Sequence, residues 1–303
     1  MTAFLVVYYL YDDSLVAAIF AGAAFSATSV GVTTAVWRDA GALNKPSGAL
    51  LVDVAELDDI SAIVMIGVLF ALAPLLDTEA RAPLASLIAR EAGLAVLKLL
   101  LFAIACIIFS RVFEKKLTMH FARLDPQYGA TFLAAGAAFA LSAMADFMGL
   151  SVAIGAMFAG LTFSRDPAER TIDQSFAPIY DMFAPFFFVG IGMSVDISTL
   201  AGAAGMALVL FAAAILGKLV GVGAPALRFV PARGALLLGA SMIPRAEVAL
   251  LVMGYGLGLG PSVISQELYN AVVLTSLASC IASPIIVRRL LQTRPSSQEE
   301  ALS

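Results

Sequence analysis

Two neighbouring carboxylates lie in a stretch of the sequence that is otherwise almost entirely apolar. In VAELDDISAIVMIGVLFAL, residues 54–72, the acids Glu56, Asp58 and Asp59 are followed by thirteen residues without charge. A charge at the centre of a bilayer costs about 2.5–3.5 kcal/mol on insertion scales, so intramembrane acids indicate a function. Successive helical residues point about 100° apart, so Asp58 and Asp59 cannot share one proton face to face. The spacing predicts that one aspartate exchanges a proton for a cation while a basic partner holds the other.

Lys218 is our candidate for that basic partner. It lies in the apolar stretch LFAAAILGKLVGVG, a few residues from the predicted inner end of a span. Extension of the lysine to the membrane interface is the alternative interpretation. Desolvation favours the neutral form of a carboxylic acid and of a lysine, so groups of both kinds can exchange protons inside a membrane.

Two predicted spans carry polar residues at their centres. AGAAFSATSVGVTTAV contains Thr28 and Ser29, and LLLGASMIPRAEVALLVMGYGLG contains Pro244, Arg245 and Glu247. A proline removes a backbone hydrogen bond from the middle of a helix. Interrupted helices in corresponding positions of two halves indicate a transporter binding site. The alternatives are ordinary packing of small residues in the first span, and in the second a kinked structural helix with an internal Arg245–Glu247 ion pair.

The composition predicts an all-α polytopic membrane protein that positions these groups. Of the 303 residues, 61% are hydrophobic and 13% charged, against about 25% charged in soluble domains. Apolar windows of about 20 residues predict nine full spans, after a short apolar run that resembles the tail of a helix. The predicted spans are 14–37, 48–75, 84–112, 128–147, 149–164, 176–195, 198–221, 234–258 and 264–287.

The basic residues of the predicted loops are distributed unevenly between the two sides of the membrane. Alternating the loops assigns thirteen of them to one side, from Arg38 to Arg294, and Arg81 alone to the other. By the positive-inside rule the richer side is cytoplasmic. We therefore predict a multi-pass protein of the plasma (inner) membrane with a cytoplasmic C-terminus.

Taken in order, several stretches resemble the monovalent cation:proton antiporter superfamily, in its bacterial and archaeal branch of Na⁺/H⁺ and K⁺/H⁺ exchangers. The resemblance implies two inverted repeats with two discontinuous crossing helices, and an incomplete first repeat, since the family usually carries more N-terminal helices. It implies an ion-transport core in residues 1–75 and 196–290, linker and dimerisation helices in 76–195 and a cytoplasmic tail in 291–303. The stretches are SATSVGVTTAVWRDAGAL, ELDDISAIV, GLSVAIGAMFAGLTFS, APFFFVGIGMSVDIS, ILGKLVG and MIPRAEVALLV.

The resemblance also implies roles for individual residues. Asp59 would be the principal carboxylate for the cation (Na⁺) and the proton, and Asp58 would pair with Lys218. Thr28 and Ser29 would line the crossing, and Arg245 and Glu247 would stabilise the second broken helix. Asp53 and Glu56, where the family commonly has small or apolar residues, would extend a cytoplasmic acidic funnel or be solvated. Ala246 stands where the family usually has glycine.

The resulting prediction is a secondary transporter, and not an enzyme, that exchanges Na⁺ or Li⁺ for protons by alternating access. A K⁺/H⁺ antiporter is the nearest alternative, and a passive channel, a non-transporting ion or pH sensor and an inactive fragment belong to other classes. An intramembrane aspartyl protease needs two acids on separate helices, which the adjacent Asp58 and Asp59 do not provide. We expect no cofactor beyond the transported Na⁺ or K⁺ and H⁺. The expected partners are the lipid bilayer and, for a full-length chain, a second copy in a homodimer, with no nucleic acid.

Overall fold

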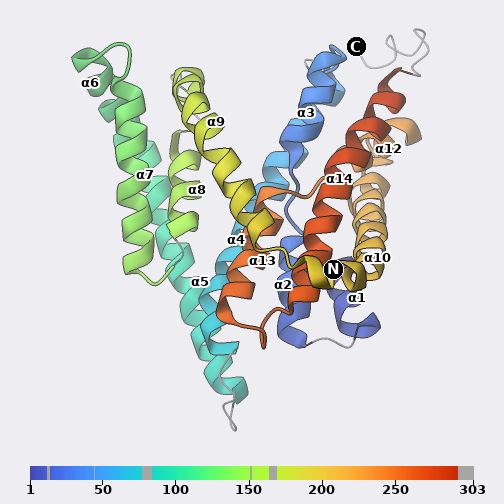
Figure 1. Cartoon of the computed structure of the whole chain (residues 1–303). Helices are drawn as coiled ribbons and strands as arrows, with labels where there is room; N and C mark the ends of the chain where they lie inside the picture. The colour runs from blue at the N-terminus through green and yellow to red at the C-terminus, as the bar shows by residue number, and fades with distance from the viewer. Residues whose placement is uncertain (12–13, 44, 77–83, 151, 164–168, 293–303) are drawn as a thin grey trace. The chain divides into compact units, whose positions relative to one another are not determined.

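The computed structural model describes residues 1–11, 14–43, 45–76, 84–150, 152–163 and 169–292, and this part of the chain is helical without a β-strand (Figure 1). It forms two compact units. Unit 1 comprises Met1–Ala62 and Val195–Ser303, and unit 2 comprises Ile63–Ser194. Helix α4 (Pro46–Leu76) contributes to both units. The division of labour between an ion-transport core and dimerisation helices stays a prediction.

Unit 1 contains the two spans that the sequence predicts to be interrupted, and each is divided into two helices. The first consists of α2 (Leu15–Ala24) and α3 (Val30–Asp39). The second consists of α12 (Ala232–Ser241) and α13 (Glu247–Leu259). The hydroxyl of Ser14 caps α2 by accepting the amide of Ala17 at 3.0 Å, which is the usual role of an N-cap serine.

Unit 1 contains further helices and turns. They are α1 (Thr2–Leu10), the start of α4, a 3₁₀ turn (Ile197–Thr199), α10 (Leu200–Lys218), a π-helical turn (Leu219–Gly223), α11 (Ala224–Ala226) and α14 (Gln266–Gln292). Helix α13 packs on α2 and α14, and α3 packs on α14 and α12. A Cβ atom on Gly256 would lie 2.9 Å from the Phe20 ring, so glycine permits the close approach of α13 to α2.

A buried cluster joins α3 to α12 beside the two interruptions. Trp37 is fully buried, and its Nε1 donates to Ser241 Oγ at 2.9 Å. Thr33 Oγ1 donates to the carbonyl of Ser241 at 2.9 Å. These bonds satisfy polar groups that would otherwise be costly to bury, and they fix the end of α12 against α3.

Unit 2 consists of the rest of α4, α5 (Leu84–Ile108), a π-helical segment (Phe109–Glu114), α6 (Lys115–Leu124), α7 (Gly129–Phe147), α8 (Val152–Phe163) and α9 (Glu169–Met193). Its closest packing is between α7 and α8, where a Cβ atom on Gly155 would lie 2.4 Å from the Cα atom of Ser142. The polar connection that contains His120 is helical and forms α6. The polar and apolar residues of α6 fall on opposite sides of the helix, so that one side suits the hydrocarbon and the other suits water.

Among the described residues, five helices are long and apolar enough to cross a membrane. They are Val96–Leu124, Gly129–Phe147, Gln174–Met193, Ile197–Ala226 and Gln266–Gln292. Helices α2 and α13 are apolar but shorter, since each is one half of an interrupted span. These helices fit a polytopic membrane protein, whereas the count of nine spans and the inverted-repeat relation remain predictions.

Candidate functional site

The two interruptions cross within unit 1 and are joined by their backbones. The amide of Ser29, just before α3, donates to the carbonyl of Pro244, between α12 and α13, at 2.9 Å. Each interruption leaves backbone groups without partners inside their own helix. The crossing satisfies some of them directly and brings the remaining polar side chains of both segments together.

Arg245 closes the end of α2. Its Nη1 atom donates to the carbonyls of Ser26, at 3.3 Å, and Ala27, and lies 3.3 Å from Thr28 Oγ1. The side chain is only 2% exposed. A cation at the C-terminal end of a helix is also favoured by the helix dipole. Arg245 therefore stabilises the first interruption from within the second.

Lys218, at the end of α10, also extends to the end of α2. Its Nζ atom lies 2.7 Å from Asp58 Oδ1 and 3.3 Å from the carbonyl of Ser26. Only 10% of the lysine side chain and 18% of the aspartate side chain are exposed. Lys218 therefore points to Asp58 rather than along the membrane interface.

Both oxygens of Asp58 accept hydrogen bonds. Oδ1 accepts from Lys218, and Oδ2 accepts from Thr28 Oγ1 at 2.6 Å. Thr28 is itself buried. Asp58 thus ties α4 to α10 and to the first interruption, and its charge is compensated inside the protein.

Asp59 is in a different environment. It is exposed on α4, and within the described part of the chain no hydrogen bond or ion pair holds its carboxylate. It is still close enough to Lys218, Glu247 and Glu56 for their charges to act on it. Of the two adjacent aspartates, Asp59 is therefore the one whose carboxylate is free to bind a cation or a proton.

Glu247 begins α13, where the helix dipole favours an acid. Its Oε2 atom accepts from Ser29 Oγ at 2.8 Å. The contacts of the described residues thus pair Arg245 with α2 and Glu247 with Ser29, and contain no Arg245–Glu247 ion pair. The alternative of a kinked helix closed by its own ion pair does not fit this arrangement.

Asp53 and Glu56 lie on α4 with exposed side chains. The charge of Glu56 acts on Asp59, whereas no contact among the described residues brings Asp53 to the crossing. Their role in a funnel stays a prediction.

Helix α14 contributes polar residues that sequence reasoning missed. Ser279 Oγ accepts the amide of Arg245 at 2.9 Å, and Cys280 Sγ donates to the Arg245 carbonyl at 3.3 Å. Ser283 Oγ donates to the carbonyl of Ala240 at 2.8 Å. The available signal was the recurrence of Ser276, Ser279 and Ser283 every three or four residues in one span, which places them on one helix face.

The charges around the crossing do not balance. Two cations, Lys218 and Arg245, face three acids, Asp58, Asp59 and Glu247. With all five groups ionised, these five residues carry one excess negative charge, and Glu56 adds a further negative charge near Asp59. One proton or one monovalent cation at Asp59 would offset one of these negative charges.

Replacing Lys218 by methionine is expected to reduce the free energy of unfolding by about 3 kcal/mol, because Asp58 keeps its charge but loses its buried partner. The measurement is thermal unfolding of the purified protein in detergent. The control is the double variant Asp58→Asn/Lys218→Met, which removes both charges and should recover most of the loss. Equal losses in the single and double variants would contradict the pairing as the cause.

The chain is similar in sequence to known proteins. The family model described as "Sodium/hydrogen exchanger, transmembrane" matches residues 1–293. The chain is 28% identical over 275 residues to a Na⁺/H⁺ antiporter of Enterococcus hirae, covering 89% of this chain and 68% of that protein. It is 25% identical over 273 residues to the Na⁺/H⁺-K⁺ antiporter GerN of Bacillus cereus, covering 89% and 67%.

A third relative, the high-affinity Na⁺/H⁺ antiporter NhaS3 of Synechocystis sp., is 28% identical over 258 residues, covering 83% of this chain and 54% of that protein. The chain thus spans about two thirds of the first two relatives and about half of the third. The family model covers almost the whole chain and includes both interruptions and every residue of the crossing. The chain therefore belongs to the transmembrane sodium/hydrogen exchanger family, within the monovalent cation:proton antiporter superfamily.

Proposed function

We propose that the protein exchanges Na⁺ or Li⁺ for protons across the membrane, with Asp59 as the shared binding carboxylate. The observation that carries this proposal is the contrast between the two aspartates. Asp58 is held by Lys218 and Thr28, whereas Asp59 is exposed and has no bonded partner among the described residues. A proton and a cation that compete for one carboxylate cannot be bound together, and this competition couples the two fluxes.

The proposed cycle is alternating access. A cation from one side displaces the proton from Asp59, the crossing is exposed to the other side, and a proton displaces the cation there. Thr28 and Ser29 provide hydroxyl oxygens at the crossing, and oxygen is the ligand type that hard cations prefer. Arg245 and Glu247 hold the two interruptions together and do not bind the transported ions in this cycle. The transported ions are the only small molecules that the cycle requires.

Exchange of K⁺ for protons is the second candidate. Its support is that one relative is named a Na⁺/H⁺-K⁺ antiporter and another, from Arabidopsis thaliana, is K⁺ efflux antiporter 6, 27% identical over 276 residues. The same carboxylate serves both reactions, so the two candidates differ only in the preferred cation. A non-transporting sensor or an inactive fragment would show no coupled flux.

The proposed setting is the plasma (inner) membrane with the C-terminus in the cytoplasm, because the basic residues of the predicted loops gather on that side. We further propose that residues 76–195 include the dimerisation helices. Asp53 and Glu56, both exposed on α4, would attract cations toward Asp59 from the cytoplasmic side.

The test is reconstitution of the purified chain into liposomes with an acidic interior and a pH-sensitive dye inside. Adding Na⁺, Li⁺ or K⁺ outside should release protons from the interior, and the most effective cation identifies the branch. Choline and protein-free liposomes are the controls. A response to no cation from protein that elutes as a single folded species would contradict exchange, and a current without proton movement would indicate a channel.

A further inference from the structure

A cavity of about 330 Å³ lies between the last turns of α3 and α14, at one end of unit 1. It is lined by Val36, Asp39, Ala40, Arg288, Leu291 and Gln292. Its volume is at the lower end of the range for small-molecule sites. The proposed mechanism makes no use of it, because Asp58 and Asp59 lie on α4 and the crossing lies at the start of α3.

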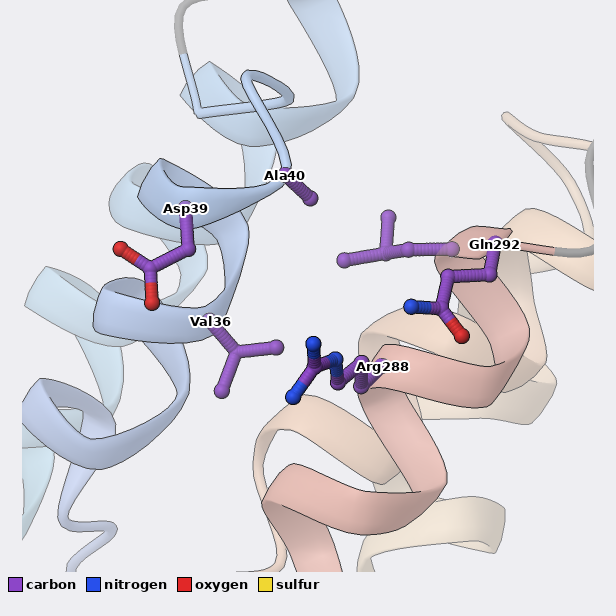
Figure 2. Close-up of a pocket in the computed structure, with 6 residues that line it drawn as sticks. Val36, Asp39, Ala40, Arg288 and Gln292 are labelled. Carbon is purple, nitrogen blue, oxygen red and sulfur yellow. The ribbon is translucent and has the colours of Figure 1, made fainter.

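Arg288 is the charged group that enters this cavity. Its guanidinium extends from α14 toward α3, while Val36 and Ala40 point from α3 toward α14 (Figure 2). The carboxylate of Asp39 is directed away from Arg288 (Figure 2). Within the described residues, no hydrogen bond or ion pair holds the guanidinium. Asp39 also lines the cavity, so the positive charge that a ligand would meet there is the exposed guanidinium of Arg288.

The surroundings favour an anion further. Arg38 on the last turn of α3 and Arg289 on the last turn of α14 add positive charge nearby. Arg233 Nη2 donates to the carbonyl of Leu290 at 3.2 Å. This bond occupies one of the last four carbonyls of α14, which would otherwise repel an anion.

The position suggests the source of the anion. Helices α3 and α14 both end at this cavity. The positive-inside rule predicts that the loop and tail following these two ends are cytoplasmic. The cytoplasmic leaflet is the one that carries anionic lipids. A phosphate diester fits the planar guanidinium in a two-point contact, and the amide of Gln292 offers a further donor. Val36 and Leu291 provide an apolar wall for the glycerol region of a lipid.

We propose that this cavity binds the phosphate group of an anionic phospholipid from the cytoplasmic leaflet, with Arg288 as its principal ligand. Helix α3 starts at the crossing, and α14 holds the backbone of Arg245 through Ser279. A headgroup bound to both helices restrains the separation of two elements that define the ion site. The proposal concerns binding and does not depend on the transported ion.

The test measures lipid binding by the full chain, purified in a neutral detergent and stripped of lipid. Native mass spectrometry and thermal unfolding are followed while phosphatidylglycerol, phosphatidylcholine or inorganic phosphate is added. The variants are Arg288→Gln, which removes the charge, and Ala40→Phe, which fills the cavity and keeps the charge. Arg228→Gln is the matched control, because Arg228 is exposed and does not line the cavity.

Phosphatidylglycerol should bind and stabilise the wild type more than phosphatidylcholine does. The apparent Kd for phosphatidylglycerol should rise roughly tenfold or more in Arg288→Gln, the usual loss for a hydrogen bond to a charged group. It should also rise in Ala40→Phe and change less than about twofold in Arg228→Gln. Equal binding by Arg288→Gln and Arg228→Gln would overturn the site. Stabilisation by inorganic phosphate, with phosphatidylglycerol no better than phosphatidylcholine, would overturn the lipid assignment.

Discussion

Asp59→Asn is expected to reduce cation-driven proton release to the level of protein-free liposomes while leaving the protein folded. Asparagine removes the carboxylate that we propose binds the proton and the cation, but nothing in the described part of the chain depends on that carboxylate for a hydrogen bond. An exposed side chain without partners contributes little to stability. The liposome assay with Na⁺, Li⁺ and K⁺ gives the first readout, and thermal unfolding in detergent gives the second.

Two replacements on the same helix serve as controls for Asp59→Asn. Asp53→Asn removes an exposed carboxylate of α4 outside the crossing, so exchange should continue, with at most a weaker apparent cation affinity. Asp58→Asn removes the negative charge that pairs with Lys218 and leaves one acceptor oxygen where Lys218 and Thr28 used two, so it should lower the unfolding temperature as well as transport. Ion exchange by Asp59→Asn would contradict the role of Asp59 as the ion-binding carboxylate. Unchanged stability of Asp58→Asn would contradict the structural role of Asp58.

The residues that meet at the crossing are conspicuous in the sequence for a physical reason. Acids, a lysine and a proline are costly within apolar spans, so Asp58, Asp59, Lys218 and Pro244 are conspicuous. Their cost implies compensation, and the structure has a contact for Lys218 at Asp58. The two interrupted helices were predictable for the same reason. The functional roles of these residues await the experiments described above.

What the sequence does not reveal is the choice of partners across the crossing. Arg245 and Glu247 are two residues apart, and only the three-dimensional arrangement sends one to α2 and the other to Ser29. The serines of α14 are equally hard to interpret, because small hydroxyl residues in a span also serve ordinary helix packing. The cavity at Arg288 depends on how two helix ends approach one another, which residue types alone do not determine. Helix α6 was missed because its charged residues resemble those of a loop.

Arg245→Leu is expected to give the largest loss of stability, about 5 kcal/mol or roughly 10 °C in apparent Tm. Leucine is similar in bulk but leaves the carbonyls of Ser26 and Ala27 with fewer donors, in a place where the arginine side chain is only 2% exposed. The Ser26 carbonyl keeps Lys218 as a donor, but each lost hydrogen bond to the charged guanidinium costs about 1.5–3 kcal/mol. Arg245→Lys keeps the charge but not the planar fork of donors, so it should lose less.

The fluorescence of Trp37 reports on the effect of Arg245→Leu. Trp37 is the single tryptophan of the chain, it is fully buried, and it donates to Ser241 at the end of α12, next to the interruption that contains Arg245. Its emission should shift to longer wavelength and its unfolding transition to lower temperature in Arg245→Leu, but not in the exposed control Arg228→Leu. Similar spectra and transitions in the two variants would mean that the crossing is held by its backbone and by α14, and that Arg245 is retained for transport alone.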